Sequence, residues 1–169
     1  DDEILKAMRR GYTNAEYRTL VQKLRDRIPG VSIATDIIVG FPGETLTAFQ
    51  KTVDLLQDLR LDSVHLARYS PRPNTYSARF LADDVPADEK MRRFRVLEDL
   101  QQHILTELNA PLLGQNVPVL FETKAKNRWK GRTPTNRIVF VETERNLWGE
   151  ELSVQITWTG PWSLLGKLE

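Results

Sequence analysis

The chain has 169 residues and contains no cysteine, only two histidines and no long hydrophobic run. Without cysteine, neither a disulfide nor a thiolate metal site can form within it. A membrane-spanning helix needs about 18 consecutive apolar residues, and a secretory signal needs a basic start followed by an apolar segment. Since neither is found, we expect a cytoplasmic protein with no membrane partner.

The sequence also lacks a strong net charge and an evident catalytic constellation. Its formal charge is +1, so the total charge indicates no partner, and 40% hydrophobic residues is typical of a globular protein. His65 and His103 lie far apart, and no carboxylate is spaced to form a triad or a metal set with them. We therefore predict no catalytic residue and no metal ligand in this chain.

The beginning of the chain has a helical pattern. Residues 1–10 predict a helix that ends at Gly11, and there is no initiator Met. Because a domain seldom starts inside a helix, we expect this chain to be a piece of a longer polypeptide. Thr13 and Glu16 have the spacing of a capping box, and apolar residues then recur at helical period as far as Ile28.

The first half of the chain alternates between helices and strands. Residues 31–39 are mostly apolar, which predicts a parallel strand that is buried on both faces. A helix over 46–59 and a second strand over 63–69 follow. The order helix–strand–helix–strand is typical of an α/β fold with right-handed crossovers.

The second half changes character after a loop over 70–85 and a long helix predicted over 87–109. Beyond residue 116 the sequence has short β-type runs separated by Gly, Asn and Pro, namely VPVLFET, RIVFVET, ELSVQITWT and SLLGKLE. Such spacing predicts a small antiparallel barrel, for which we count five strands.

The first candidate site is the turn Gly-Phe-Pro-Gly-Glu at the carboxyl end of the first strand, where α/β folds bind ligands. Gly40 and Gly43 would allow close approach of a ligand to the backbone. Glu44 would either cap the next helix or accept hydrogen bonds from a ligand, and Thr35 and Asp36 add polar groups. The alternative is an ordinary strand–turn–helix connection with a capping glutamate.

A second candidate, RYSPRPNT, leaves the second strand at the same edge of the sheet. Arg68, Tyr69 and Arg72 could bind an anion or stack on a base, and the prolines would stiffen the loop. The alternative is a surface loop with scattered arginines.

The third candidate is the basic stretch over 123–141, which contains six Lys or Arg side chains, no acidic residue and Trp129. Cations for phosphates and an aromatic ring for stacking favour RNA binding. The alternative is a solvated hairpin with Trp129 packed on the barrel.

Four motifs in order, DDEILKAMRRGYT, TDIIVGFPGET, YSPRPNT and GRTPTNRIVF, resemble the radical-SAM methylthiotransferases. Most similar is the MiaB-type branch, which acts on isopentenyladenosine beside the tRNA anticodon. The resemblance covers nearly the whole chain. It implies the C-terminal part of an α/β, partial TIM-like radical-SAM barrel over residues 1–110, followed by a small all-β, OB-like TRAM barrel over residues 111–169. Asn74 and Pro134 depart from the family pattern, which usually has Gly and a basic residue there.

The resemblance implies that the strand ending at Gly40 helps to seat S-adenosylmethionine, with Arg10 pairing with its carboxylate. The implied cofactor-binding residues are Arg10, Thr35, Asp36, Gly40 and Glu44. Tyr69 and Arg72 would face the reaction chamber or the tRNA loop. The implied RNA-binding residues of the TRAM barrel are Arg128, Lys130, Arg132, Thr133, Asn136 and Arg137.

The family holds two [4Fe-4S] clusters through cysteines that would lie upstream of Asp1, in cluster-binding domains of the same polypeptide. The complete enzyme would use a 5′-deoxyadenosyl radical to add a methylthio group to C2 of N6-isopentenyladenosine at position 37, in the anticodon stem-loop of tRNA. This chain alone would be inactive. Two alternatives remain: a stand-alone TRAM-type RNA-binding module, or a methylthiotransferase for threonylcarbamoyl-adenosine in tRNA or for a ribosomal protein.

Overall fold

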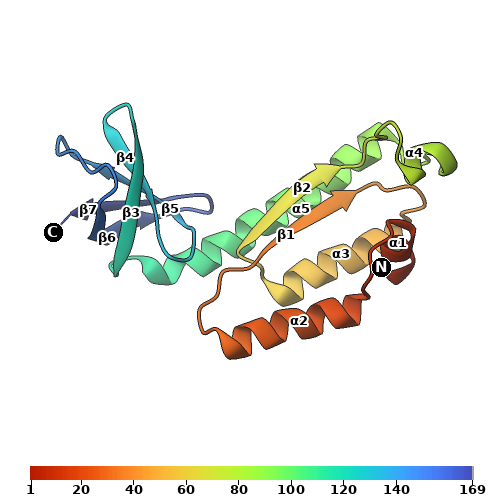
Figure 1. Cartoon of the computed structure of the whole chain (residues 1–169), viewed down its shortest axis with the longest axis horizontal. Helices are drawn as coiled ribbons and strands as arrows, with labels where there is room; N and C mark the ends of the chain where they lie inside the picture. Colours follow the sequence, from red (N-terminus) through yellow and green to blue (C-terminus); the bar gives the residue numbers. More distant parts are fainter. Residues whose placement is uncertain (169) are drawn as a thin grey trace. The chain divides into compact units, whose positions relative to one another are not determined.

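The computed structural model describes residues 1–168 and divides by its internal contacts into two compact units (Figure 1). The first unit is Asp1–Gln101 and the second begins at Gln102. Contacts alone define these units, so the predicted domain boundary after residue 110 stays a prediction. Glu169, the last residue of the predicted run SLLGKLE, lies outside the described residues.

All the α-helices of the described chain begin in the first unit, and the last of them extends past Gln101. In order, the elements are α1 (Asp2–Ala7), α2 (Asn14–Arg27), β1 (Ala34–Val39), α3 (Leu46–Leu59), β2 (Ser63–Arg68), α4 (Tyr76–Phe80) and α5 (Ala87–Asn109). The predicted order is confirmed, and α5 has the predicted bounds. The capping box of Thr13 and Glu16 is present at the start of α2.

Two local predictions for this unit are wrong. Helix α1 ends at Ala7 rather than at Gly11, because Arg9 takes a left-handed conformation (φ 59°) and turns the chain away. Helix α4 lies inside the predicted loop, where the Thr75 side chain accepts a hydrogen bond from the backbone of Ala78 and caps it. No helix of residues 1–168 is long and apolar enough to cross a membrane.

Strands β1 and β2 form a parallel pair with helices on one face (Figure 1). Val21 of α2, Leu56 of α3 and Leu97 of α5 belong to one core with the inward residues of the strands. Asp36 and Ile38 point the other way and are exposed. The prediction that β1 is buried on both faces is therefore wrong, since helices cover only one. Two parallel strands agree with the α/β class but are too few to establish a barrel.

The second unit is a closed five-stranded barrel in the order β3-β4-β5-β7-β6, which confirms the predicted number of strands. After the short 3₁₀ helix η1 (Ala110–Leu112), its strands are β3 (Asn116–Ala125), β4 (Arg128–Arg132), β5 (Ile138–Glu142), β6 (Glu151–Thr159) and β7 (Leu164–Leu168). Strands β5 and β7 pair in parallel, whereas the prediction was an antiparallel barrel.

Strand β4 is the strand that the sequence pattern did not reveal, because its residues, RWKGR, look like part of a basic loop. Trp129 and Gly131 alternate into the barrel core, and Trp129 is only 5% exposed. Strand β3 passes so close that a Cβ atom at Gly131 would lie 2.5 Å from the Val119 side chain and 2.6 Å from the Leu120 carbonyl oxygen. Glycine is therefore required for the contact of β3 with β4.

Gly131→Ala should destabilise the barrel by about 1–3 kcal/mol, because the added methyl group overpacks a core contact that includes backbone. All four tryptophans lie in the second unit, so urea unfolding followed by tryptophan fluorescence measures that unit. Gly11→Ala is the control, since its methyl group meets nothing within 4 Å. A barrel transition that is identical in the two variants would contradict the close contact.

Candidate functional site

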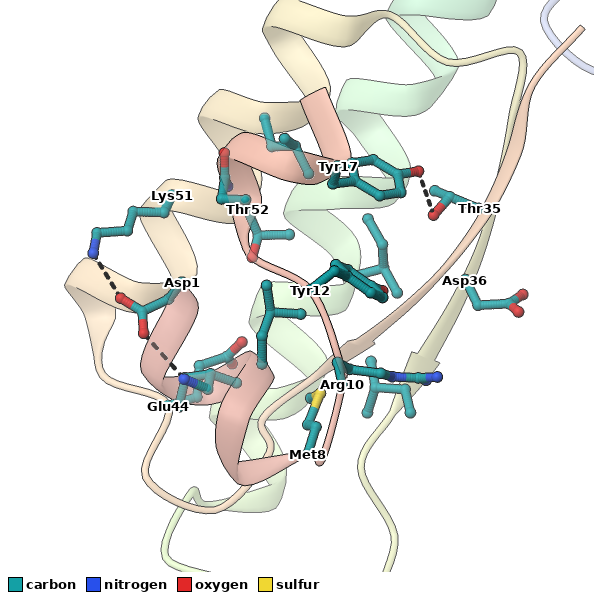
Figure 2. Close-up of a pocket in the computed structure, with 16 residues that line it drawn as sticks. Asp1, Met8, Arg10, Tyr12, Tyr17, Thr35, Asp36, Glu44, Lys51 and Thr52 are labelled. Carbon is teal, nitrogen blue, oxygen red and sulfur yellow. Dashed lines mark hydrogen bonds and ion pairs between the residues drawn. The ribbon is translucent and has the colours of Figure 1, made fainter. Parts of the chain in front are cut away.

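A pocket of about 120 Å³ lies along the free edge of β1, between that strand and helices α1 to α3 (Figure 2). It brings together four of the five predicted cofactor-binding residues, Arg10, Thr35, Asp36 and Glu44, whereas Gly40 is not part of its wall. Within residues 1–168, the Arg10 guanidinium and the Asp36 carboxylate have no hydrogen-bond or ion-pair partner. Both charged groups are therefore available to a ligand.

Local backbone structure explains the positions of Arg10 and Thr35. The N–H of Arg10 donates to the carbonyl of Leu5 (2.8 Å) and that of left-handed Arg9 donates to Lys6 (2.9 Å), a Schellman ending of α1. This ending turns Arg10 toward β1. The Tyr17 hydroxyl donates to Thr35 Oγ1 (2.9 Å), which leaves the proton of the threonine hydroxyl for another acceptor.

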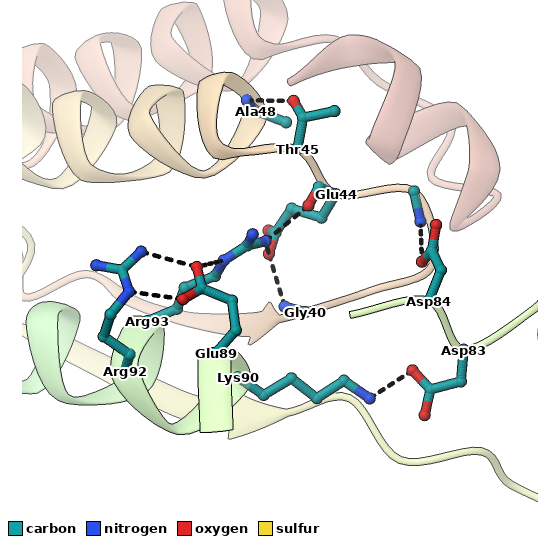
Figure 3. A network of polar contacts seen from close by, with 11 residues as sticks. Gly40, Glu44, Thr45, Ala48, Asp83, Asp84, Glu89, Lys90, Arg92 and Arg93 are labelled. Atoms are coloured by element: carbon teal, nitrogen blue, oxygen red, sulfur yellow. Dashed lines mark hydrogen bonds and ion pairs between the residues drawn. The ribbon is translucent and has the colours of Figure 1, made fainter. Parts of the chain in front are cut away.

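The Gly-Phe-Pro-Gly-Glu turn is held by a buried ion pair with the start of α5 (Figure 3). The Glu44 carboxylate accepts from the N–H of Gly40 and from Arg93 Nη1, both at 2.6 Å, and Arg93 also donates to the Glu44 carbonyl (2.7 Å). Glu44 does not cap α3, because the N-cap is Thr45. The capping alternative is therefore wrong, and the Glu44 carboxylate closes the turn instead.

Lys90 explains why position 40 is glycine. Gly40 has a φ of 71°, and a Cβ atom there would lie 2.3 Å from Cγ of Lys90. We had predicted that Gly40 leaves this space for a ligand. The Lys90 side chain occupies it instead. The Lys90 ammonium pairs with Asp83 and lies 5.2 Å from the Tyr69 ring centroid, so it connects the turn after β1 with the segment after β2.

Sequence reasoning missed Lys90 and Arg93, because residues 87–109 were interpreted only as a long helix. Arg93 is 49 positions away from Glu44, and no local pattern links the two. Glu89 adds to the cluster by binding Arg92 through two hydrogen bonds (2.6 and 2.7 Å) and Arg93 through a third (2.7 Å). These bonds, first from Arg92 and then from Arg93, lower the pKa of Glu89 to about 2.

A second pocket, of about 250 Å³, contains both predicted residues of the YSPRPNT segment, Tyr69 and Arg72. It lies at the carboxyl ends of the strands and shares Met8, Arg10 and Ile38 with the first pocket. The Tyr69 ring packs edge-on against Phe41, with centroids 5.1 Å apart. The structure thus brings the first two candidate sites side by side.

The predicted RNA surface of the barrel is less basic than its sequence. The stretch itself has no acidic residue, but strand pairing places Glu142 of β5 near Arg128 (3.7 Å) and Glu122 of β3 near Arg132 (3.2 Å). Lys130 has no such partner among residues 1–168 and is partly exposed. Cross-strand glutamates therefore pair with two of the six basic side chains of this stretch.

The other three predicted RNA-binding residues stabilise the turn between β4 and β5. Thr133 is 8% exposed, and its hydroxyl accepts from the N–H of Arg137 (3.1 Å). Asn136 has a φ of 63°, a left-handed conformation that asparagine tolerates. The Arg137 guanidinium donates to Asn109 (2.8 Å) and to Thr135 (2.7 Å).

Trp129 cannot be the stacking residue that we predicted, since its ring lies in the barrel core. The alternative, that Trp129 packs on the barrel, is confirmed.

Across residues 1–168 there is also no group of His, Cys, Asp or Glu side chains that could hold a metal ion.

Family models match both units. Residues 1–56 match the radical SAM superfamily, and residues 112–168 match the TRAM domain. The first range contains every predicted cofactor-binding residue, and the second contains every predicted RNA-binding residue of the barrel, whereas Tyr69 and Arg72 lie outside both. The chain thus contains a segment that matches the radical SAM superfamily, followed by a segment that matches the TRAM domain.

Individual relatives are more specific than the family models. The chain is 46% identical to a tRNA-2-methylthio-N(6)-dimethylallyladenosine synthase of Dehalococcoides mccartyi over 99% of this chain and 40% of that protein. It is 49% identical to the synthase of that name in Chloroflexus aurantiacus and 50% identical to that of a Roseiflexus species, each over 36% of the relative. Over nearly its whole length the chain is thus similar to these tRNA methylthiotransferases, and it spans about two fifths of their length.

Among solved structures, a multidomain protein with nucleic acid binding domains from Streptococcus pneumoniae matches 40% of this chain and 28% of its own, with 20% identity and a TM-score of 0.31. A likeness this weak carries no argument.

Arg93→Ala should destabilise the first unit by about 3–5 kcal/mol, because it leaves the Glu44 carboxylate buried without its cation. Arg92→Ala is the matched control: Arg92 also binds Glu89, but its side chain is 50% exposed, so its loss should cost no more than about 1 kcal/mol. Urea unfolding followed by helical circular dichroism measures the difference. Equal losses would contradict a buried clamp.

The low pKa of Glu89 predicts a pH dependence of stability. Because the pKa is about 2 in the folded chain and 4.5 without the arginines, ionised Glu89 stabilises the fold at higher pH, and this contribution disappears as the pH falls from 4.5 toward 2. Glu89→Gln should flatten the stability curve in that window, as measured by urea unfolding at each pH. Glu98→Gln, at a helix position without an ion pair in the described chain, should leave the slope unchanged.

Proposed function

We propose that this chain is part of an enzyme that adds a methylthio group to C2 of N6-isopentenyladenosine at position 37 of tRNA by radical S-adenosylmethionine chemistry. The observation that carries the proposal is the pocket beside β1. It brings the unpartnered charges of Arg10 and Asp36 together with the Thr35 hydroxyl, all inside the range that matches the radical SAM superfamily.

These groups suit S-adenosylmethionine. Arg10 would bind the carboxylate of the cofactor, since a guanidinium offers two parallel hydrogen bonds. Thr35 and Asp36 would hydrogen-bond other polar groups of the cofactor, while Glu44 would act indirectly, by keeping the Gly40 turn closed. A pocket of about 120 Å³ is smaller than the ~300–1,000 Å³ of typical small-molecule sites, so it would hold one end of the cofactor.

Bound S-adenosylmethionine supplies a 5′-deoxyadenosyl radical when an iron–sulfur cluster reduces it. With no cysteine, this chain cannot ligate either of the two [4Fe-4S] clusters that the family uses, so other domains of the same polypeptide would hold them. This chain would contribute cofactor and RNA binding, and by itself it would not catalyse the reaction.

The RNA partner would be the anticodon stem-loop of tRNA, which also argues for a cytoplasmic location. Tyr69 and Arg72 would lie near the target nucleoside. On the TRAM barrel, Arg128, Lys130 and Arg132 have groups that reach solvent, whereas Thr133, Asn136 and Arg137 would act by shaping the turn that presents them.

The alternatives differ in what they predict for binding. A stand-alone TRAM-type module would bind RNA but not S-adenosylmethionine, and it would give no reason for two free charges beside β1. The names of the relatives, which specify dimethylallyladenosine, favour that nucleoside over threonylcarbamoyl-adenosine or a ribosomal protein.

Arg10→Ala should weaken binding of S-adenosylmethionine to the chain by roughly 10- to 100-fold, the range for losing a hydrogen bond to a charged group. Equilibrium dialysis with the labelled cofactor measures this. Arg27→Ala is the control, because Arg27 is also exposed and unpartnered among the described residues but lies far along α2. If the unaltered chain shows no saturable binding, the cofactor role fails. If both variants bind equally, Arg10 is not the ligand.

A further inference from the structure

Arginines in the two units differ in whether they have partners. In the described part of the second unit every arginine is engaged by an acidic or amide side chain: Arg128, Arg132, Arg137 and Arg145. In the first unit, the guanidinium groups of Arg10, Arg68 and Arg72 have no hydrogen-bond, ion-pair or ring partner within residues 1–168. All three line the same pocket of about 250 Å³.

The side chains that line this pocket fit a ligand with both an anionic group and an apolar part. Its wall contains no acidic residue, and Ser70 and Ser77 add hydroxyl groups beside the three arginines. Its apolar part comes from Ile38, Phe41 and other side chains near the strand ends. Uncompensated cations next to an apolar and aromatic surface are typical of a site for a nucleotide, whose phosphate and sugar–base parts need both.

Arg72 is held ready for such a ligand by its own backbone. Pro71 and Pro73 flank it and restrict its conformation. Its carbonyl oxygen accepts hydrogen bonds from the N–H (3.2 Å) and the hydroxyl (2.8 Å) of Thr75. The backbone is therefore fixed before a ligand arrives, so binding would cost the conformational entropy of the Arg72 side chain alone.

The backbone of Arg68 is also fixed. It is the last residue of β2 and lies opposite Val39, the last residue of β1, in the parallel register. The next residue, Tyr69, donates its N–H to the Val39 carbonyl (2.8 Å) and extends that pairing. The carboxyl ends of parallel strands are where α/β folds bind their ligands.

We propose that Arg68 and Arg72 form a binding site for a phosphodiester group of the RNA substrate, next to the cofactor pocket and separate from it. The assignment rests on the proposed function. The two pockets share Arg10 and Ile38. A phosphate bound by Arg68 and Arg72 therefore holds the RNA strand beside the cofactor pocket. The TRAM barrel then binds RNA more weakly, since its arginines must first give up acidic or amide partners.

Fluorescence anisotropy with a labelled RNA stem-loop, measured over a series of salt concentrations, tests the site on the whole 169-residue chain. Each phosphate contact adds roughly 0.7–0.9 to the slope of log K against log salt. Arg68→Ala and Arg72→Ala should each weaken binding about 5- to 20-fold at low salt and reduce the slope by about one. Arg95→Ala, an exposed and unpartnered arginine of α5 outside the pocket, should change neither.

Two further measurements separate the explanations. Arg72→Lys should restore part of the affinity and the salt slope, since it keeps the charge but loses the paired hydrogen bonds, whereas a merely folding-defective site would not recover. Affinity for S-adenosylmethionine should stay unchanged in Arg68→Ala and Arg72→Ala. If cofactor affinity falls and the RNA slope does not, the pocket binds the cofactor and the assignment is overturned. If the unaltered chain binds no RNA, the proposed RNA role fails together with it.

Discussion

The buried pair of Arg93 and Glu44 is the interaction on which the candidate site depends. It joins the first turns of α5 to the turn that follows β1, and the same carboxylate oxygen bonds the backbone of Gly40. A buried pair costs desolvation, and apolar residues of similar volume often stabilise a fold as well. What the pair provides here is a fixed conformation of one turn, with Lys90 extending that constraint to the segment after β2.

Electrostatics divide the molecule in a way that composition hides. The chain has 24 basic and 23 acidic residues, so its net charge suggests no ligand. In the barrel, strand pairing matches basic with acidic side chains across neighbouring strands. At the carboxyl ends of β1 and β2, three arginines without such partners among the described residues, Arg10, Arg68 and Arg72, line one pocket. A parallel pair with one uncovered face is itself unusual, and the free arginines gather at its carboxyl end.

Much of the fold could be predicted because its signals are local. The capping box of Thr13 and Glu16 and the bounds of α5 depend on residues a few positions apart. The errors have non-local causes. Strand β4 was missed because Trp129 is recognised as an inward-facing residue only once the barrel is closed around it. Glu44 was predicted either to cap a helix or to bind a ligand, because its actual partner, Arg93, is 49 residues away. For the site, the motifs predicted Arg10 and Asp36, which line one pocket, but no sequence pattern distinguishes a free arginine from a paired one.

The wall between the two pockets has a thermodynamic consequence. Arg10 borders both, and one guanidinium cannot form its full set of hydrogen bonds on both sides at once. A ligand that draws Arg10 to one side therefore changes the binding free energy on the other side, and linkage requires the effect to be equal in both directions. Two ligands of such a site would therefore not bind independently, and each would change the affinity for the other by the same factor.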